Sequence, residues 1–257
     1  MYSFRAMTAP HDSQESSLDL RERGAPRDGT PQYLDSRLFM QLLVLEFQRP
    51  SETTSTAIGS AVADRGMPVV VYEDVNHPAS FGVLTFSPDP ADFVTRLRPA
   101  LNSLGSAKDS APRYRSNLTM FGRTYSTGYE QDLDYWLLRR PVETVMNDAW
   151  NFAVWYPLRR SGAFEKLSGQ EKGAILREHG EIGKRYGAAD LAHDVRLACH
   201  GLDENDNEFV IGLIGRELHP LSHVVQTMRG TRQTSEYISQ MGPFFVGRAA
   251  FRSPGNR

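Results

Sequence analysis

Two segments of this 257-residue chain repeat one pattern, and this internal similarity limits the folds open to the sequence. In each copy, an apolar run is followed by two apolar residues at helical spacing: 81–86 with Phe93 and Leu97, and 209–214 with Leu221 and Val225. Phe81 and Phe209 lead the two runs, 128 positions apart, and the offset holds through both following residues. A repeated strand and helix indicates an internal duplication. The alternative is a chance similarity of two short elements.

Both copies are predicted to follow the order strand, helix, strand, strand, helix. In the first copy we expect strands at 38–47, 69–72 and 81–86, and helices at 54–65 and from the turn at 87–90 to about Leu101. In the second we expect strands at 152–156, 195–199 and 209–214, a turn at 201–207, and helices from Ser168 and from about Pro220 to Arg229. Two such βαββα halves, each with its helices on one face of an antiparallel sheet, make an α+β fold. Their sheets can pack into one barrel-like unit.

These elements divide the chain into four parts. Residues 1–35 are rich in Ser, Asp, Arg, Gly and Pro and cannot bury enough apolar surface, so they are predicted to form a disordered tail. We assign residues 36–128 to an N-terminal ferredoxin-like half and 148–252 to a C-terminal one, with 129–147 as the connection. The stretch 105–115 is interpreted as an exposed linker.

Composition narrows the class of partner and the compartment. The net charge of −2 gives no electrostatic reason to expect nucleic acid or a membrane surface. Cys199 is the only cysteine, which favours a reducing compartment. No signal peptide is visible and no apolar run is long enough to span a bilayer, so we expect a cytoplasmic protein. The sequence also lacks GxGxxG, Walker, GxSxG and HExxH motifs.

His179 lies on the face that the helix after Ser168 would bury. Ile175 and Ile182 fall on the same helical stripe, four residues before it and three after it. A neutral imidazole on a buried face needs a hydrogen-bond partner or a metal. Gly180 and Gly183 would let a flat ligand approach. A core histidine with its hydrogen bonds satisfied and a frayed helix end are the alternatives.

Tyr156 ends a predicted strand just before Pro157. A turn at 157–162 is expected to bring Arg159 and Arg160 close to its ring. Arginine side chains suit carboxylates, and isolated pairs suit a small anionic ligand better than a polyanion. Packing for the tyrosine and solvated surface charge for the arginines are the alternatives.

The strand around Arg196 alternates between polar and apolar residues. Asp194, Arg196 and His200 share one face, and His193 lies on the other. His193 and His200 therefore cannot chelate one ion from a regular strand.

The second half also carries a set of short motifs in a fixed order: Tyr156-Pro157 with Arg160, the run 177–183, Gly201-Leu202-Asp203, Met228-Arg229, and the run 242–247. This ordered set resembles the chlorite dismutase-like family of haem proteins, and the closer match is its coproheme decarboxylase branch. The resemblance is strong from about Asn151 to Arg248. From Ser36 to Leu101 it is mainly architectural.

The resemblance implies a fold, a reaction and a set of roles. The fold is two ferredoxin-like halves in one α+β barrel, usually within a homopentamer. The reaction is the hydrogen-peroxide-dependent decarboxylation of Fe-coproporphyrin III (coproheme) to haem b in haem biosynthesis, catalysed by an oxidoreductase. His179, in the haem-binding C-terminal half, would be the proximal iron ligand, and Tyr156 would form the radical that takes hydrogen from a propionate. Four arginines are candidates to hold the propionates: Arg139, Arg140, Arg159 and Arg160.

One position departs from the family pattern. Chlorite dismutases carry a distal arginine on the strand before the Gly-Leu-Asp turn, and many decarboxylases carry a glutamine there. Counting back from Gly201, the equivalent residue is Asp194, with Arg196 two residues on and on the same face. An aspartate would repel chlorite, whereas Arg196 would partly restore a positive site. Because Tyr156 is present we favour decarboxylation; a chlorite dismutase-type enzyme and a non-catalytic haem-binding protein are the alternatives.

Overall fold

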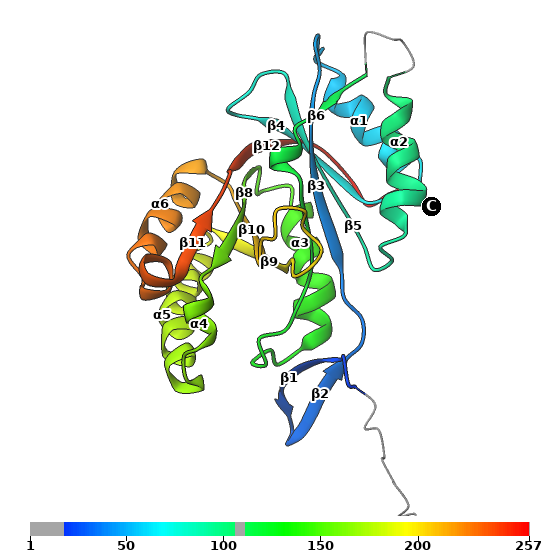
Figure 1. Ribbon diagram of the computed structural model, residues 1–257. Helices are drawn as coiled ribbons and strands as arrows, with labels where there is room; N and C mark the ends of the chain where they lie inside the picture. The colour runs from blue at the N-terminus through cyan, green and yellow to red at the C-terminus, as the bar shows by residue number, and fades with distance from the viewer. Residues whose placement is uncertain (1–17, 106–110, 257) are drawn as a thin grey trace, which may run out of the picture.

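A ten-stranded antiparallel sheet closes on itself in this computed structural model, which describes residues 18–105 and 111–256 (Figure 1). Its main strands are β3 (Phe39–Glu46), β4 (Val69–Asp74), β5 (Ser80–Ser87), β7 (Met120–Arg123), β8 (Phe152–Arg160), β9 (His193–Ala198), β10 (Phe209–Gly215) and β12 (Phe245–Ser253). Two short strands pair at its side: β6 (Arg113–Tyr114) with β3, and β11 (Ile238–Met241) with β8.

The two halves have the same strand order. The first half runs β7-β3-β5-β4 across the sheet and the second runs β12-β8-β10-β9, which is the order of a ferredoxin-like fold in both cases. The last strand of each half also pairs with the other half, β12 with β4 and β7 with β9. The predicted α+β fold with two ferredoxin-like halves is confirmed.

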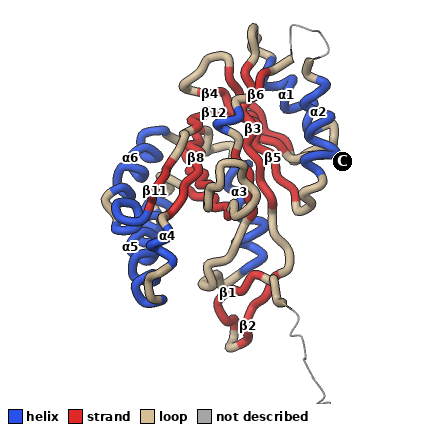
Figure 2. The backbone as a smooth tube through the Cα atoms, in the orientation of Figure 1, coloured by secondary structure: helices blue, strands red, loops and turns tan. Residues whose placement is uncertain are grey.

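Helices cover the outside of the closed sheet in two separate groups (Figures 1 and 2). The first half carries α1 (Thr54–Ala63) and α2 (Arg98–Ser103), which follows a π-helical turn at Phe93–Leu97. The second half carries α4 (Gly162–Glu165), α5 (Gly169–Ala188) and α6 (Leu218–Arg229). One further helix, α3 (Arg140–Met146), follows the π-helical turn Tyr135–Arg139. Both lie in residues 129–147, which were predicted to connect the two halves.

Apolar side chains on both faces of each strand explain this arrangement. One set points into the closed sheet and includes Tyr72, Trp155 and Phe245. The opposite faces form one core under α1 and α2 and another under α5 and α6. Glycine makes room for the aromatic rings inside: a Cβ on Gly212 would lie 2.6 Å from the Trp155 ring.

The two halves differ in the helix after the first strand and in the seams that join them; in the second half this helix, α5, carries His179. Helix α5 has 20 residues, compared with 10 in α1, and it begins at the predicted Ser168 with a capping box between Ser168 and Glu171. The seam between β12 and β4 pairs over Gly247–Ser253, whereas β7 and β9 pair only at Arg123 and Ala198. The first part of β9 is therefore an open edge of the sheet.

The prediction of a turn at 157–162 is wrong, because strand β8 continues through Pro157 to Arg160. Proline lacks a backbone donor and was expected to end the strand. Its carbonyl accepts a hydrogen bond from the Gly242 N–H, in the gap between β11 and β12. Both backbone groups of Pro157 face this gap, so the missing N–H breaks no ladder bond.

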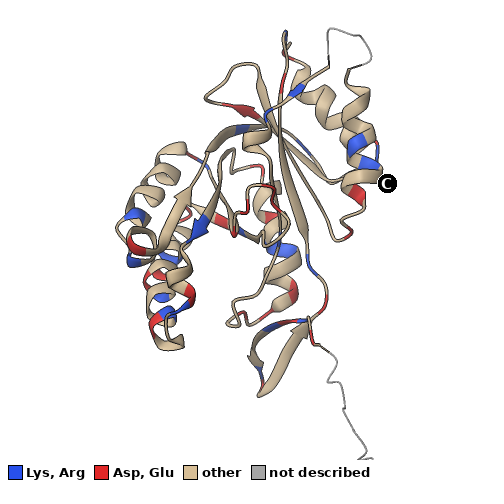
Figure 3. Ribbon diagram, in the orientation of Figure 1, with Lys and Arg blue, Asp and Glu red and all other residues tan. Residues whose placement is uncertain are grey.

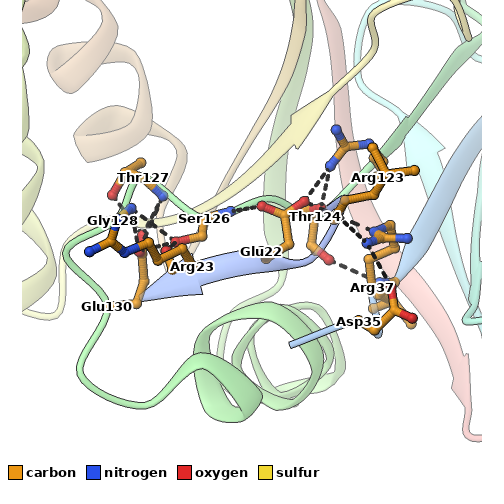
Figure 4. Close-up of polar contacts among 12 residues, drawn as sticks. Glu22, Arg23, Asp35, Arg37, Arg123, Thr124, Ser126, Thr127, Gly128 and Glu130 are labelled. Carbon is orange, nitrogen blue, oxygen red and sulfur yellow. Dashed lines mark hydrogen bonds and ion pairs between the residues drawn. The ribbon is translucent and has the colours of Figure 1, made fainter. Parts of the chain in front are cut away.

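The prediction of disorder for residues 1–35 is wrong for the part that the structure describes; residues 1–17 lie outside it. Strands β1 (Glu22–Arg27) and β2 (Thr30–Leu34) form a hairpin. Polar contacts hold it: Glu22 accepts hydrogen bonds from Arg123 at 2.7 Å and from the Ser126 N–H at 3.0 Å (Figure 4). The low apolar content of residues 1–35 therefore did not predict this hairpin, because polar contacts stabilise it. Five of the eleven residues of the predicted linker 105–115, residues 106–110, also lie outside the described residues, and Arg113–Tyr114 form strand β6.

Glu130 organises the loop beside this hairpin (Figure 4). Its buried carboxylate accepts hydrogen bonds from the hydroxyls of Ser126 and Thr127 and from the backbone N–H groups of Thr127 and Gly128. Burial alone would raise the pKa of Glu130, but these hydrogen bonds hold it below its usual value. The Glu130 carbonyl in turn accepts from the Ala25 N–H of the hairpin at 2.9 Å.

No helix within residues 18–105 and 111–256 is long and apolar enough to cross a membrane. Figure 3 shows that acidic and basic residues alternate along the ribbon of α4 and α5.

We predict that Glu130→Gln lowers the free energy of unfolding at pH 7 by about 1–3 kcal/mol, because it leaves buried donors without their charged acceptor. A lowered carboxyl pKa adds stability that is present above the unfolded-state value near 4.3 and is lost as the pH falls through the folded-state pKa. The stability gap between wild type and variant should therefore narrow on acidification. Urea denaturation at several pH values measures this, with exposed Glu52→Gln as the control. A gap that stayed constant down to pH 3 would contradict the prediction.

Candidate functional site

One wall of the candidate site is the face of β8, β10 and β9 that lies under α5 and α6. Strand register aligns Tyr156 with Ile211, and Ile211 with Arg196, in one row across the three strands. The neighbouring row aligns Val154, Leu213 and Asp194 in the same way. Residues at the two ends of a row have backbones about 10 Å apart, since neighbouring strands are about 4.8 Å apart. The sheet thus brings a phenol, a carboxylate and a guanidinium to one face.

Helix α5 places His179 over this wall. Ile175 and Ile182 anchor the helix and are buried, whereas His179 between them is half-buried. Its Nδ1 lies 3.5 Å from the hydroxyl of Thr231, which itself donates to the Met228 carbonyl at 2.8 Å. A hydroxyl that donates elsewhere accepts from Nδ1–H, and this tautomer leaves the Nε2 lone pair for a metal.

The protonation state of His179 also suits a ligand. Burial lowers the pKa of its imidazole, and the positive charge of Arg196 lowers it further, against the opposing charges of Asp194 and Glu178. The neutral form, which binds metals, is therefore favoured. Helix α5 also contacts β9, the strand that carries Arg196 and Asp194.

The surroundings of His179 fit a flat iron tetrapyrrole, the group that the sequence resemblance implies. A Cβ on Gly180 would meet no atom within 4 Å, and one on Gly183 would meet only Met228, at 3.8 Å. Partly buried apolar side chains from the sheet and from α6 line the same layer: Ile211, Val225, Met228, Met241 and Phe244. An imidazole donor above an apolar wall is a suitable environment for haem iron.

Tyr156 is held rigidly and kept protonated. Its side chain is buried and its ring stacks on Phe244, with centroids 4.7 Å apart and planes 24° apart. Burial raises the pKa of its phenol, the negative charge of Asp194 adds to this, and Arg229 opposes it. A phenol that does not ionise in the physiological range can lose only a hydrogen atom, or an electron together with its proton.

Asp194 bridges two arginines at the open edge of β9. Its Oδ1 accepts from Arg140 Nη2 at 2.7 Å and its Oδ2 lies 3.1 Å from Arg196 Nε. Arg140 also donates to the Asp194 carbonyl at 2.8 Å. Burial alone would raise the pKa of Asp194, but Arg196 and Arg140 hold it below its usual value.

A polar hollow lies beside this bridge. The residues that line it include Thr124, Tyr125, Glu130, Trp136, Arg140 and Arg196. Burial raises the pKa of the Tyr125 phenol, with Arg196 and Arg160 opposing and Asp194 and Glu130 reinforcing the shift. Tyr125 thus brings a second phenol close to the charged groups of the wall.

The four arginines predicted to hold propionates do not lie together. Arg140 binds Asp194, as described, but Arg139 pairs with Asp132 and Asp134 on an exposed surface. Arg159 lies on the other face of β8 from Tyr156 and donates to the Asn205 carbonyl. Arg160 shares the face of Tyr156, but it pairs with Glu208 at 3.1 Å and stacks over Phe164 and Phe209.

His193 and His200 have separate partners, and His200 lies in the turn after β9 and not in the strand as expected. His193 stacks on Trp150 and binds Asp190 at 2.9 Å, whereas His200 packs edge-on against Phe209. Within the described residues no group of three or more His, Cys, Asp or Glu side chains is arranged to hold a metal ion.

Sequence reasoning missed three residues of this site. Arg229 was quoted within a motif, but its effect on Tyr156 appears only once α6 lies against β8. Thr231 meets His179 across 52 positions, and Tyr125 follows a short strand with no distinctive pattern. No spacing rule signals such contacts, because each joins separate elements.

Comparisons with known proteins agree with this geometry. Residues 63–250 match the profile of the chlorite dismutase family. A search of curated proteins finds no match.

Solved structures show the same fold at low sequence identity. A haem-binding protein from Thermus thermophilus is 19% identical with a TM-score of 0.59, covering 84% of this chain and 92% of that one. Chlorite dismutase from Candidatus Nitrospira defluvii, in complex with imidazole, is 11% identical with a TM-score of 0.61 and the same coverage.

We predict that Thr231→Val speeds tetrapyrrole loss about tenfold or more, because removing the partner of a ligating histidine typically weakens metal binding by about 10–100-fold. Transfer of haem to excess apomyoglobin, followed by absorbance, measures the rate. Thr227→Val on α6 is a matched control, since Thr227 contacts Tyr186 and not His179. Equal rates for both variants would contradict the orienting role of Thr231.

Proposed function

Because the chain belongs to the chlorite dismutase family, we propose that it is a coproheme decarboxylase acting in haem biosynthesis. Its substrates are Fe-coproporphyrin III and hydrogen peroxide. Each round oxidises one propionate by two electrons, so that one peroxide and one proton are consumed and a vinyl group, carbon dioxide and two waters are formed. Two rounds give haem b. The observation that carries this proposal is the buried Tyr156 phenol, stacked on Phe244, on the strand wall that lies under α5 and α6.

His179 would hold the iron through Nε2, with Thr231 fixing the imidazole through Nδ1. The bound iron porphyrin supplies the redox chemistry, as cofactors do in such enzymes. The protein contributes position and protonation. The open space beside Gly183, four residues after His179, leaves room for the flat ring against α5, while Ile211 and Phe244 would shield the ring from water on the opposite wall.

Tyr156 would relay the oxidation to the propionate. The phenol would give its hydrogen atom to the oxidant that peroxide supplies at the bound porphyrin, and the neutral radical would take a hydrogen atom from the propionate β-carbon and return to the phenol. The carbon radical would pass a second electron to the same oxidant as its bond to the carboxylate carbon breaks, which leaves the vinyl group and carbon dioxide. The raised pKa supports this role, because an ionised phenolate would have no hydrogen to give. The stack on Phe244 keeps the ring in one orientation through both steps.

Arg229 is the best placed cation for a propionate near Tyr156. Its charge acts on the Tyr156 phenol, and it lies in the last turn of α6. Arg160 lies on the same face of β8, with Glu208 as its present partner. Both would bind carboxylates more directly than Arg139 or Arg159, which contact other parts of the surface.

Arg196 favours a second candidate function, chlorite degradation. A guanidinium on the β9 wall is the type of group that binds an oxyanion. Sustained oxygen evolution from chlorite by the haem-loaded protein would support this candidate over decarboxylation. Tight haem retention with turnover of neither substrate would instead support a non-catalytic haem-binding protein. A homopentamer in the cytoplasm remains part of the proposal, and sedimentation measures the oligomer size.

We predict that Tyr156→Phe binds coproheme with nearly unchanged affinity but releases less than about 1% of the wild-type carbon dioxide, a loss at the level expected for a group that acts only in the reaction. The phenyl ring keeps the stack on Phe244, so only the hydrogen donor is lost. Mass spectrometry of the tetrapyrrole after peroxide addition detects each decarboxylation as a separate mass.

Tyr237→Phe is the matched control, because Tyr237 packs on Phe164 away from the wall. It should convert coproheme to haem b at the wild-type rate. Full activity in Tyr156→Phe would contradict the proposed mechanism, and a wild-type protein that binds coproheme without any loss of mass would contradict the proposed function.

A further inference from the structure

Asp194 uses both carboxylate oxygens within the protein. One binds Arg140 and the other binds Arg196, at 2.7 and 3.1 Å. Arg140 also donates to the Asp194 backbone carbonyl, so Arg140 holds Asp194 at one carboxylate oxygen and one backbone oxygen. We refer to these three residues, Arg140, Asp194 and Arg196, as the edge clamp.

The edge clamp changes what an incoming molecule meets on the β9 wall. Arg196 is aligned with Ile211 and Tyr156, and its side chain is 39% exposed. Without Asp194 it would present a positive charge there. With Asp194 at 3.1 Å, an anion that approaches Arg196 also approaches a carboxylate with the same exposed fraction. Glu130 lies in the adjoining hollow and adds another negative charge.

Further contacts hold Asp194 close to Arg196. Asp194 cannot turn its carboxylate away from Arg196 without also moving the Oδ1 atom that accepts a hydrogen bond from Arg140. Arg140 is itself stacked over Trp136, with its guanidinium carbon 4.7 Å from the ring centroid. The pairing of Asp194 with Arg196 is therefore supported by Arg140 and Trp136 and does not stand alone.

We propose that the edge clamp selects a neutral oxidant: Asp194 cancels the charge of Arg196, so that hydrogen peroxide is accepted on the β9 wall and small oxyanions are disfavoured. This inference rests on the proposed tetrapyrrole site and makes Asp194 a specificity-determining residue of it. Repulsion between the Asp194 carboxylate and an incoming oxyanion would disfavour binding of the oxyanion. A neutral molecule with both donors and acceptors loses nothing to this repulsion.

Fluoride and imidazole test the proposal as iron-binding probes, the first an anion and the second neutral at pH 8. In the ferric haem-loaded protein, Asp194→Asn should bind fluoride about tenfold more tightly and imidazole within about twofold of wild type. Absorbance titration gives both constants. Asp190→Asn is the matched control, because Asp190 pairs with His193 and Arg216 outside the edge clamp.

Two further variants exclude a structural explanation. The double variant Asp194→Asn with Arg196→Gln should lose the gain in fluoride affinity, since no cation then remains to be exposed. Arg140→Gln, which keeps both charges but frees Asp194, should show a smaller gain than Asp194→Asn. Unchanged fluoride affinity in Asp194→Asn, or an equal gain for imidazole, would overturn the proposal.

The outcome is separable from that of the proposed function. A protein that decarboxylates coproheme but shows no fluoride gain in Asp194→Asn contradicts only the edge clamp. A fluoride gain in a protein that performs no decarboxylation contradicts only the proposed reaction.

Discussion

Closure of one sheet from two similar halves is the constraint on which the rest of the structure depends. Once β12 pairs with β4, the interior is filled by apolar side chains and both outer faces still carry apolar residues. Helices must then cover each outer face, because exposed apolar patches of that size are unfavourable in water. The candidate site is a product of this requirement, since it lies between one outer face and its covering helices.

The two coverings are not equivalent. Under α1 and α2 most apolar side chains are fully buried, and Gly59 of α1 touches the Phe251 ring. Under α5 and α6 many remain only partly buried, although the covering helix is longer. The second seam, between β7 and β9, is also short, and its open edge gives charged groups such as Asp194 and Arg196 access to partners from α3. If β7 and β9 paired along their full length, these charged groups would lose access to those partners, and burying them unpaired would be unfavourable.

Features set by short-range patterns were predictable from the sequence, whereas those set by contacts between elements were not. The duplicated strands, the Ser168 capping box and the burial of the His179 face follow from periodicity and local chemistry. The continuation of β8 through Pro157 depends on a gap between β11 and β12 that no local rule describes. The arginine pairs show the same limit: Arg139 and Arg140 are neighbours in sequence, yet only Arg140 reaches the site. Strand alternation similarly separates Arg159 from Arg160.

The unequal lengths of the two seams also determine where the closed sheet can open. Local opening begins where the fewest backbone hydrogen bonds must break, and between the two halves this is the contact of β7 with β9. Thermal fluctuations should therefore concentrate beside the edge clamp and leave the β4–β12 side nearly rigid. A duplicated fold has in this way divided its mechanics: the β4–β12 seam is the stiff join between the halves, and the β7–β9 seam is the compliant one.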